Sequence, residues 1–157
     1  MIAKKSPIVL KDFAILNSEL KFLAPQEQVD VQELFNKYRI DADYMIQEAN
    51  GEFLIFSKVS INRNNQSLPG YVIFAESVAT FVITDKEKID PKELKAILNF
   101  TALNLALNNI RGHIVTMTSN SPMGKYLLPS IDLMHLVNEK SKKVKAVHEA
   151  RNLAAKN

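Results

Sequence analysis

The sequence predicts an α+β fold, in which a four-stranded antiparallel sheet packs against one long helix and a second, C-terminal helix. Three observations predict it. Apolar and polar residues alternate in the first half of the chain, apolar residues recur at helical spacing in the second half, and an Asn-Gly pair joins two of the alternating segments. No repeat or change in composition divides the 157 residues, so we expect one domain over residues 1–157.

Alternation predicts four strands, at residues 14–22, 38–47, 52–61 and 71–83. The clearest is 38–47, where one face is apolar and the other carries Asp41 and Asp43. Asn50-Gly51 then favours a tight hairpin turn, because both of its positions require positive φ. In the first strand we expect one face to hold Leu16, Ser18, Leu20 and Phe22. Residues 26–37 fit either a short helix or an irregular connection.

Helix signals begin at Asp90-Pro91-Lys92-Glu93, which combines a capping residue, a proline suited to the first helical position and a glutamate that can reach back. The helix that follows is apolar on more than one side and therefore needs two surfaces. One can be its own sheet, and the other a second copy of the chain or a bound polypeptide. Residues 119–125 break the helix, and Ser130 is expected to cap a second helix whose apolar stripe is Leu133, Leu136, Val137, Val144, Val147 and Leu153.

The net charge of +3 is concentrated at one end, because residues 138–157 alone carry +4 and the rest of the chain −1. Such a tail can bind nucleic acid or an acidic surface, but we favour the solvated face of a terminal helix. The chain has no cysteine, which excludes thiolate chemistry and suits a reducing cytosol. No apolar run approaches the roughly 20 residues that span a bilayer. We therefore expect a cytoplasmic protein without membrane insertion.

Residues suited to catalysis are missing. His113, His135 and His148 have no second histidine or carboxylate pair at ligand spacing, and no phosphate-binding loop or nucleophile elbow is present. Asp41 and Asp43 share a strand face, which indicates an exposed polar face rather than a cation site. They would also repel phosphate, so we do not expect the sheet to bind nucleic acid. We expect no enzyme, cofactor or metal.

Three segments, taken in order, resemble the bacterial export chaperone SecB and its SecB-like relatives. They are ILNSELKFLAP at residues 15–25, YVIFAESVATFVI at 71–83 and LLPSIDLMHLV at 127–137. The resemblance covers about residues 8–140. It implies the same four-stranded sheet with two helices, assembled as a tetramer of two dimers. Carried onto this chain, the subunit contacts are Asn104, Leu107, Asn108 and Arg111. The alternative is a monomer whose long helix lies between its sheet and its own second helix.

The resemblance also implies an ATP-independent holdase, which holds unfolded polypeptides or preproteins in apolar grooves and keeps them export-competent. The client-binding residues carried over are Val29, Val31, Leu34, Phe35, Ile40, Ala42, Tyr44, Leu133, Leu136 and Val137. Each also fits an ordinary core position. The groove is favoured for Val31, Leu34 and Phe35, because connections rarely bury so many apolar side chains.

The family docks the translocation motor SecA through acidic residues on the outer sheet face, where this chain has Glu19. Leu23 replaces a second acid, and the basic tail differs from the family's short acidic one. These departures argue against SecA as a partner. The first alternative is a SecB-like chaperone dedicated to one client, such as an antitoxin. An alternative of another class is a structural or nucleic-acid-interacting module that uses the basic tail.

Overall fold

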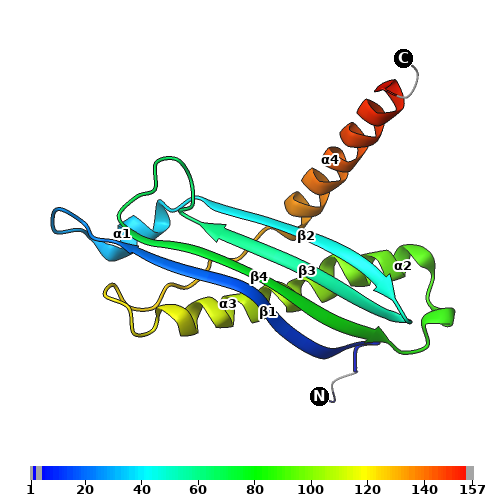
Figure 1. Cartoon of the computed structure of the whole chain (residues 1–157). Helices are drawn as coiled ribbons and strands as arrows, with labels where there is room; N and C mark the ends of the chain where they lie inside the picture. The colour runs from blue at the N-terminus through cyan, green and yellow to red at the C-terminus, as the bar shows by residue number, and fades with distance from the viewer. Residues whose placement is uncertain (1, 3–4, 155–157) are drawn as a thin grey trace.

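Four antiparallel strands form one sheet in the order β1-β4-β3-β2. The computed structural model describes residue 2 and residues 5–154, with side chains as far as residue 146. The strands are β1 (Ile8–Leu23), β2 (Ile40–Ala49), β3 (Glu52–Ile61) and β4 (Gly70–Ile83). Figure 1 shows the helical layer behind the sheet, on one face only. The predicted α+β fold is thereby confirmed.

The helical layer is nearly continuous along the chain. It comprises α2 (Pro91–Ala96), the π-helical turn η2 (Ile97–Ala102) and α3 (Leu103–Thr118). The remaining helices are α1 (Val31–Asn36), the 3-10 turn η1 (Lys86–Lys88) and α4 (Leu133–Ala154). The start signal is confirmed, since the Asp90 side chain accepts a hydrogen bond from the Lys92 amide at 2.8 Å and proline follows it. The open choice for residues 26–37 is settled as a short helix.

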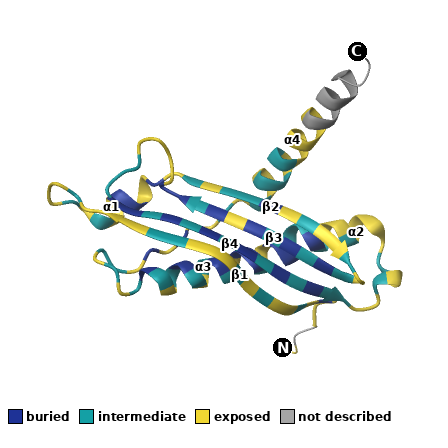
Figure 2. Cartoon of the chain, viewed as in Figure 1, coloured by how far each residue is buried: buried dark blue, intermediate teal, exposed yellow. Residues whose placement is uncertain are grey.

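The core lies between the two central strands and α3. Alternate residues of β3 and β4 are buried, as the dark bands in Figure 2 show. The fully buried apolar side chains of these strands and of the helical layer are Ile55, Val59, Ile61, Tyr71, Ile73, Ala75, Ala79, Phe81, Ala102, Leu103, Ala106, Ile110 and Ile114. The predicted hairpin between β2 and β3 is also confirmed, because Asn50 and Gly51 have φ of 53° and 76°.

The first strand is longer than expected and has two irregularities. Its register with β4 shifts between Leu10 and Asp12 and again between Ile15 and Asn17. The second shift makes Leu16 an extra residue that is 53% exposed. The expectation that Leu16 shares a face with Ser18 was therefore wrong, because a bulge interrupts the period-two alternation.

The C-terminal helix starts later than expected. Asp132, not Ser130, caps it: the Asp132 carboxylate accepts from the His135 amide at 3.0 Å. Ile131 packs against the core, which keeps the preceding backbone outside the helix. α4 packs against η2 and β2 and then projects away from the sheet. Val144 is 46% exposed, and the side chains of Val147 and Leu153 lie outside the described residues.

Candidate polypeptide-binding groove

A groove follows the free edge of β2. It consists of two adjoining cavities of about 590 Å³ and 290 Å³, which share Ile40 and Pro129. The larger cavity lies between β2 and the first turns of α4, with Ala42 and Leu136 among its walls. The smaller reaches α1, with Phe35 and Tyr126 in its lining. We call the two together the β2 groove.

The backbone of β2 contributes unpaired groups to this groove. The Asn62 amide donates to the Arg39 carbonyl at 2.8 Å, so Arg39 and Asn62 form a hydrogen-bonded pair that continues the β2–β3 ladder. Hydrogen-bonded pairs alternate along an antiparallel ladder. The tight turn at the other end of the hairpin fixes the same phase, because it closes on the pair Ala49 and Glu52. Outward-pointing backbone groups therefore belong to Ile40, Ala42, Tyr44 and Ile46.

Those same residues turn their side chains toward the helical layer, since side chains alternate between the faces of a strand. Tyr44 is 8% exposed, and its hydroxyl donates to the Asn99 side-chain oxygen at 3.1 Å. Burial, together with the nearby Asp43 carboxylate, raises the pKa of Tyr44. Asn99 belongs to η2, so this contact connects the edge strand to the π-helical turn. Ile40 and Ala42 are half-buried and remain open to the groove.

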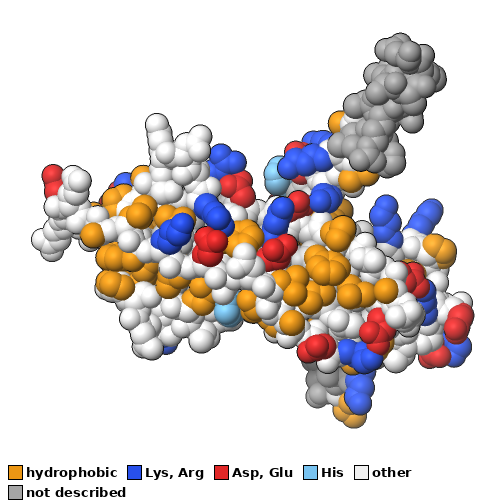
Figure 3. Space-filling model, in the orientation of Figure 1, with side chains coloured by type: hydrophobic (Ala, Val, Ile, Leu, Met, Phe, Trp, Pro, Cys, Tyr) orange, Lys and Arg blue, Asp and Glu red, His pale blue; other side chains and the backbone are white. Residues whose placement is uncertain are grey.

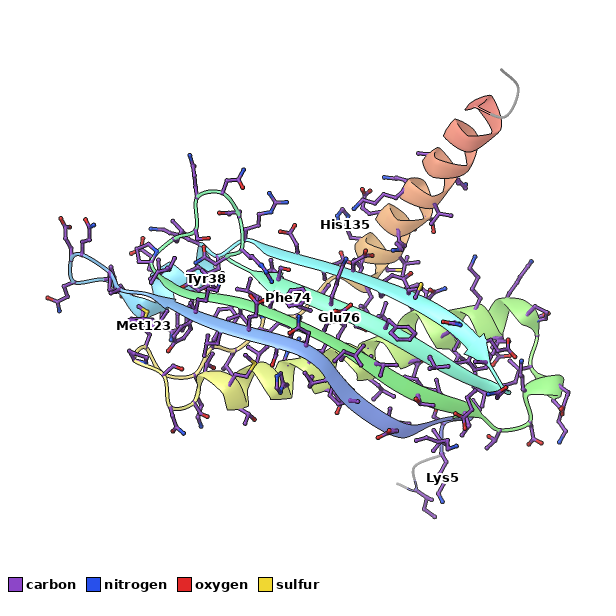
Figure 4. All side chains as sticks on the ribbon, in the orientation of Figure 1. Lys5, Tyr38, Phe74, Glu76, Met123 and His135 are labelled. Atoms are coloured by element: carbon purple, nitrogen blue, oxygen red, sulfur yellow. The ribbon has the colours of Figure 1, made fainter. Side chains whose placement is uncertain are left out.

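An aromatic cluster closes the α1 end of the groove. Phe35 lies 5.5 Å from Tyr38, 5.6 Å from Tyr71 and 5.1 Å from Tyr126 between ring centroids. The Tyr38 hydroxyl donates to the Pro69 carbonyl and accepts from the Tyr71 amide, both at 2.8 Å. Figure 4 shows Tyr38 at the end of the sheet next to α1. Burial raises the pKa of Tyr126 to about 12, and Tyr38 adds to that shift.

Some of the client-binding residues that the resemblance implies have buried side chains. Leu34 and Phe35 are each only 9% exposed, so the connection between β1 and β2 buries more than we assumed. Val31, Leu133 and Val137 are half-buried against the core. Their role in client binding stays a prediction, as it does for Leu34 and Phe35.

Val29 lies apart from the β2 groove. It lines a separate hollow of about 380 Å³ with the crossover residues that follow β1. The groove proper therefore brings together Phe35, Ile40, Ala42 and Leu136 from the predicted set. Figure 4 shows His135, another lining residue, at the base of α4 beside the sheet.

The four residues expected at subunit contacts lie on α3 in different settings. Asn104 and Asn108 are exposed, whereas Leu107 is 5% exposed and packs in the chain's own core. Arg111 donates to the Leu128 and Pro129 carbonyls at 2.8 and 3.2 Å. Arg111 thus fixes the segment that leads into α4 and forms one wall of the groove.

The outer face of the sheet, opposite α3, carries the residue expected to dock SecA. Glu19 lies 3.3 Å from the Arg63 guanidinium, and Arg63 lies over the Phe74 ring at 4.8 Å. Phe74 and Glu76 project from this face in Figure 4. Figure 3 shows apolar surface between its charged groups. The charge of Glu19 is therefore compensated within the chain.

Sequence reasoning missed two residues that fix the connection between β3 and β4. Asn62 is buried, and its side chain makes three hydrogen bonds to the backbone of Leu68 and Tyr71, at 2.8 to 2.9 Å. Gly70 has φ of +93°, and a Cβ there would lie 2.0 Å from the Tyr38 hydroxyl oxygen. The sequence Leu68-Pro69-Gly70 indicated a turn but not this contact.

In the described part of the chain, no group of three or more His, Asp or Glu side chains is placed to hold a metal ion. No described helix is long and apolar enough to cross a membrane.

Comparison with known proteins identifies the fold. Neither a protein-family model nor a curated protein sequence matches this chain. A SecB-like chaperone from Mycobacterium tuberculosis, solved with a ChAD peptide from the HigA1 antitoxin, superimposes with a TM-score of 0.59 at 15% identity. The match covers 80% of this chain and 91% of that one.

The chain has the SecB-like fold. The resemblance inferred from the sequence is thus confirmed at the level of the fold. A protein of unknown function from Streptococcus agalactiae also superimposes, with a TM-score of 0.41 at 9% identity, over 78% of this chain and 97% of that one.

Proposed function

We propose that this chain is an ATP-independent holdase that binds unfolded polypeptide segments in the β2 groove. The observation that carries the proposal is the coincidence of two binding features in the same residues. Ile40 and Ala42 offer apolar side chains to the groove and unpaired backbone groups to its edge. An unfolded segment has the complementary features, which are apolar side chains and a backbone free to pair.

The physical basis of such binding does not require a particular sequence. Burial of apolar surface contributes about 25 cal/mol per Å² whatever the residue order. Backbone pairing along a strand edge is equally independent of side chains. Charged groups of both signs flank the apolar part, including Arg39, Asp41, Glu139 and Lys143. The proposed activity is binding without catalysis, in the cytoplasm.

Within this function, a dedicated client is favoured over general export. The Mycobacterium protein of the same fold was solved with a peptide from an antitoxin. In this chain, Glu19 is paired with Arg63, which reduces the acidic character expected of a SecA docking face. Export-competent preproteins remain the second candidate client, supported by the resemblance to SecB.

We propose assembly as a tetramer, a dimer of dimers, with α3 at the subunit contacts. The exposed side of α3 presents Asn104 and Asn108, whereas Leu107 supports the helix from the core side. Polar side chains there can hydrogen-bond across a helix–helix contact without leaving a large apolar surface on the free chain.

Light scattering tests the proposal. The mass of the purified protein is measured alone, with reduced and carboxymethylated lactalbumin as a permanently unfolded polypeptide, and with folded lactalbumin as the matched control. We expect a mass near four chains that rises only with the unfolded form. A mass that rises with neither form would contradict the holdase function.

The salt dependence of binding separates the holdase from the rival function of the basic tail. Groove binding of unfolded protein is expected to persist between 50 and 200 mM salt. A nucleic-acid-binding protein that makes six to ten phosphate contacts loses affinity by a factor of about 10³ to 10⁵ over this range. In the described part of the tail, Lys140 and Lys142 already pair with Asp43 and Glu139, both at 2.7 Å.

A further inference from the structure

The outward-pointing amide of Tyr44 is already occupied. It donates to the Asp43 carboxylate at 2.9 Å. The same carboxylate oxygen accepts from the Lys140 ammonium of α4 at 2.7 Å, and the Lys58 ammonium lies 3.9 Å from the other oxygen. We call this arrangement of Asp43, the Tyr44 amide and Lys140 the Asp43 clasp. Partial burial raises the pKa of Asp43, but the bonds from Lys140 and Tyr44 outweigh it and hold the pKa below its ordinary value.

The opposite edge of the sheet has a comparable arrangement. The Thr84 amide donates to the Pro7 carbonyl at 2.9 Å, which fixes the phase of the β1–β4 ladder. Hydrogen-bonded and non-hydrogen-bonded pairs alternate along this ladder. When the alternation is continued past the first bulge, the Phe13 amide points away from the sheet. That amide donates to the Asp12 carboxylate at 2.8 Å. Both edges therefore carry an aspartate that occupies the outward amide of the next residue, an aromatic one.

An added strand would need the amide that the clasp occupies. Strand addition proceeds through alternate outward groups of the edge strand. Along β2 these are Ile40 and Ala42, which open to the groove, and then Tyr44, where the carboxylate stands in the path. To pair at Tyr44, an incoming carbonyl must displace a carboxylate that is also bound to Lys140. Charged side chains commonly protect the exposed edge strands of sheets from pairing with another chain.

We propose that the Asp43 clasp is a stop that ends strand addition on β2, so that an extended client segment pairs with Ile40 and Ala42 but not with Tyr44 or Ile46. This inference rests on the proposed holdase function and adds the register of the bound segment. The occupant is a short extended stretch of unfolded polypeptide. Beyond Ala42 it leaves the strand edge, and its side chains contact the wall formed by Leu136.

Hydrogen–deuterium exchange at single-amide resolution tests the stop. The full-length protein is measured with and without reduced, carboxymethylated lactalbumin. In the unaltered protein we expect the client to slow exchange at Ile40 and Ala42 and to leave Ile46 unchanged. In Asp43→Ala we expect slowing to extend to Tyr44 and Ile46, by roughly tenfold, which corresponds to about 1.4 kcal/mol.

Two variants serve as controls. Gln47→Ala removes a polar side chain from the same face of the same strand, but outside the lining of the groove, so we expect the unaltered pattern. Lys140→Met leaves β2 intact and releases the carboxylate from α4, so we expect the same extension as in Asp43→Ala, with smaller size. This second variant tests the stop even if Asp43→Ala does not fold.

The outcomes separate this proposal from the holdase function. Client-induced slowing at Ile46 in the unaltered protein, or slowing that still ends at Ala42 in both clasp variants, would overturn the stop. A rise in mass with client but no slowing at Ile40 would overturn the stop and leave the holdase intact. Binding of no client would overturn both. If amide exchange at Tyr44 in Asp43→Ala slows as the protein concentration is raised without client, the stop is overturned, and the clasp instead prevents pairing with a second copy of the chain.

Discussion

Gly70→Ala tests how the first residue of β4 supports the groove. The added Cβ would lie 2.0 Å from the Tyr38 hydroxyl oxygen, which forces this hydroxyl away from the Pro69 carbonyl and the buried Tyr71 amide. A non-glycine residue in the left-handed region at φ +93° costs about 1–3 kcal/mol. Leaving a buried donor unpaired costs about 1–3 kcal/mol more. We therefore expect a loss of about 2–6 kcal/mol in the free energy of unfolding.

A double-mutant cycle with Tyr38→Phe separates the two contributions. Tyr38→Phe alone is expected to cost about 1–3 kcal/mol, because the Tyr71 amide loses its acceptor. Once the hydroxyl is gone, the nearest atoms to the new Cβ are the Met123 sulfur at 3.0 Å and the ring carbon at 3.4 Å. Gly70→Ala should then cost only its backbone strain, about 1–3 kcal/mol.

Urea unfolding followed by far-ultraviolet circular dichroism measures the four proteins of the cycle. We expect the double variant to lose at least about 1 kcal/mol less free energy of unfolding than the two single variants lose together, because residues in direct contact are usually coupled. Losses that add within about 0.5 kcal/mol would refute the close approach of Gly70 and the Tyr38 hydroxyl.

Asn62, Tyr44 and His113 are polar side chains that lie wholly or partly in the protein interior. Asn62→Ala removes three hydrogen bonds and is expected to lower the free energy of unfolding, measured in urea, by about 2–4 kcal/mol. The matched control, Arg63→Ala, replaces the exposed neighbouring residue and should change this free energy by less than about 1 kcal/mol. Tyr44→Phe loses only the bond to Asn99 and should cost about 0.5–1.5 kcal/mol, with client affinity unchanged, since the Tyr44 side chain is buried and does not line the groove. Burial lowers the pKa of His113, so the unfolded chain binds the proton first and stability should fall as pH drops below the ordinary value of 6.5. His113→Gln should flatten that dependence between pH 7.5 and 5.5, and an unchanged slope would contradict it.

Strand positions and their faces could be read from the chain because alternation is a local property. The even residues of β2 face the helical layer as expected, and the Asn50-Gly51 turn set the register of the hairpin. The register in turn decides which backbone groups of β2 point away from β3, whereas the strand order of the folded sheet makes that side an open edge. The bulge at Leu16 could not be predicted, because an extra residue leaves no mark in composition.

Burial in the connections was the least predictable feature. Leu34 and Phe35 are each only 9% exposed. The aromatic cluster of Tyr38, Tyr71 and Tyr126 assembles around Phe35 from three separate segments, although Phe35 also lines the smaller cavity of the groove. The start of α4 moved from Ser130 to Asp132 for a similar reason, since Ile131 is held by the core. Such contacts join residues far apart in the chain, and no local pattern encodes them.

The sequence by itself determined the α+β class, the presence of four strands, the inward faces of β2, β3 and β4 and the order of the helices, because alternation and helical spacing depend only on near neighbours. The tertiary structure decided where a client can reach the backbone. Asp41 and Asp43 look equivalent in the sequence, two residues apart on one strand face. Only Asp43 bonds to both the Tyr44 amide and Lys140, 97 residues away, because folding brings α4 to the edge of β2.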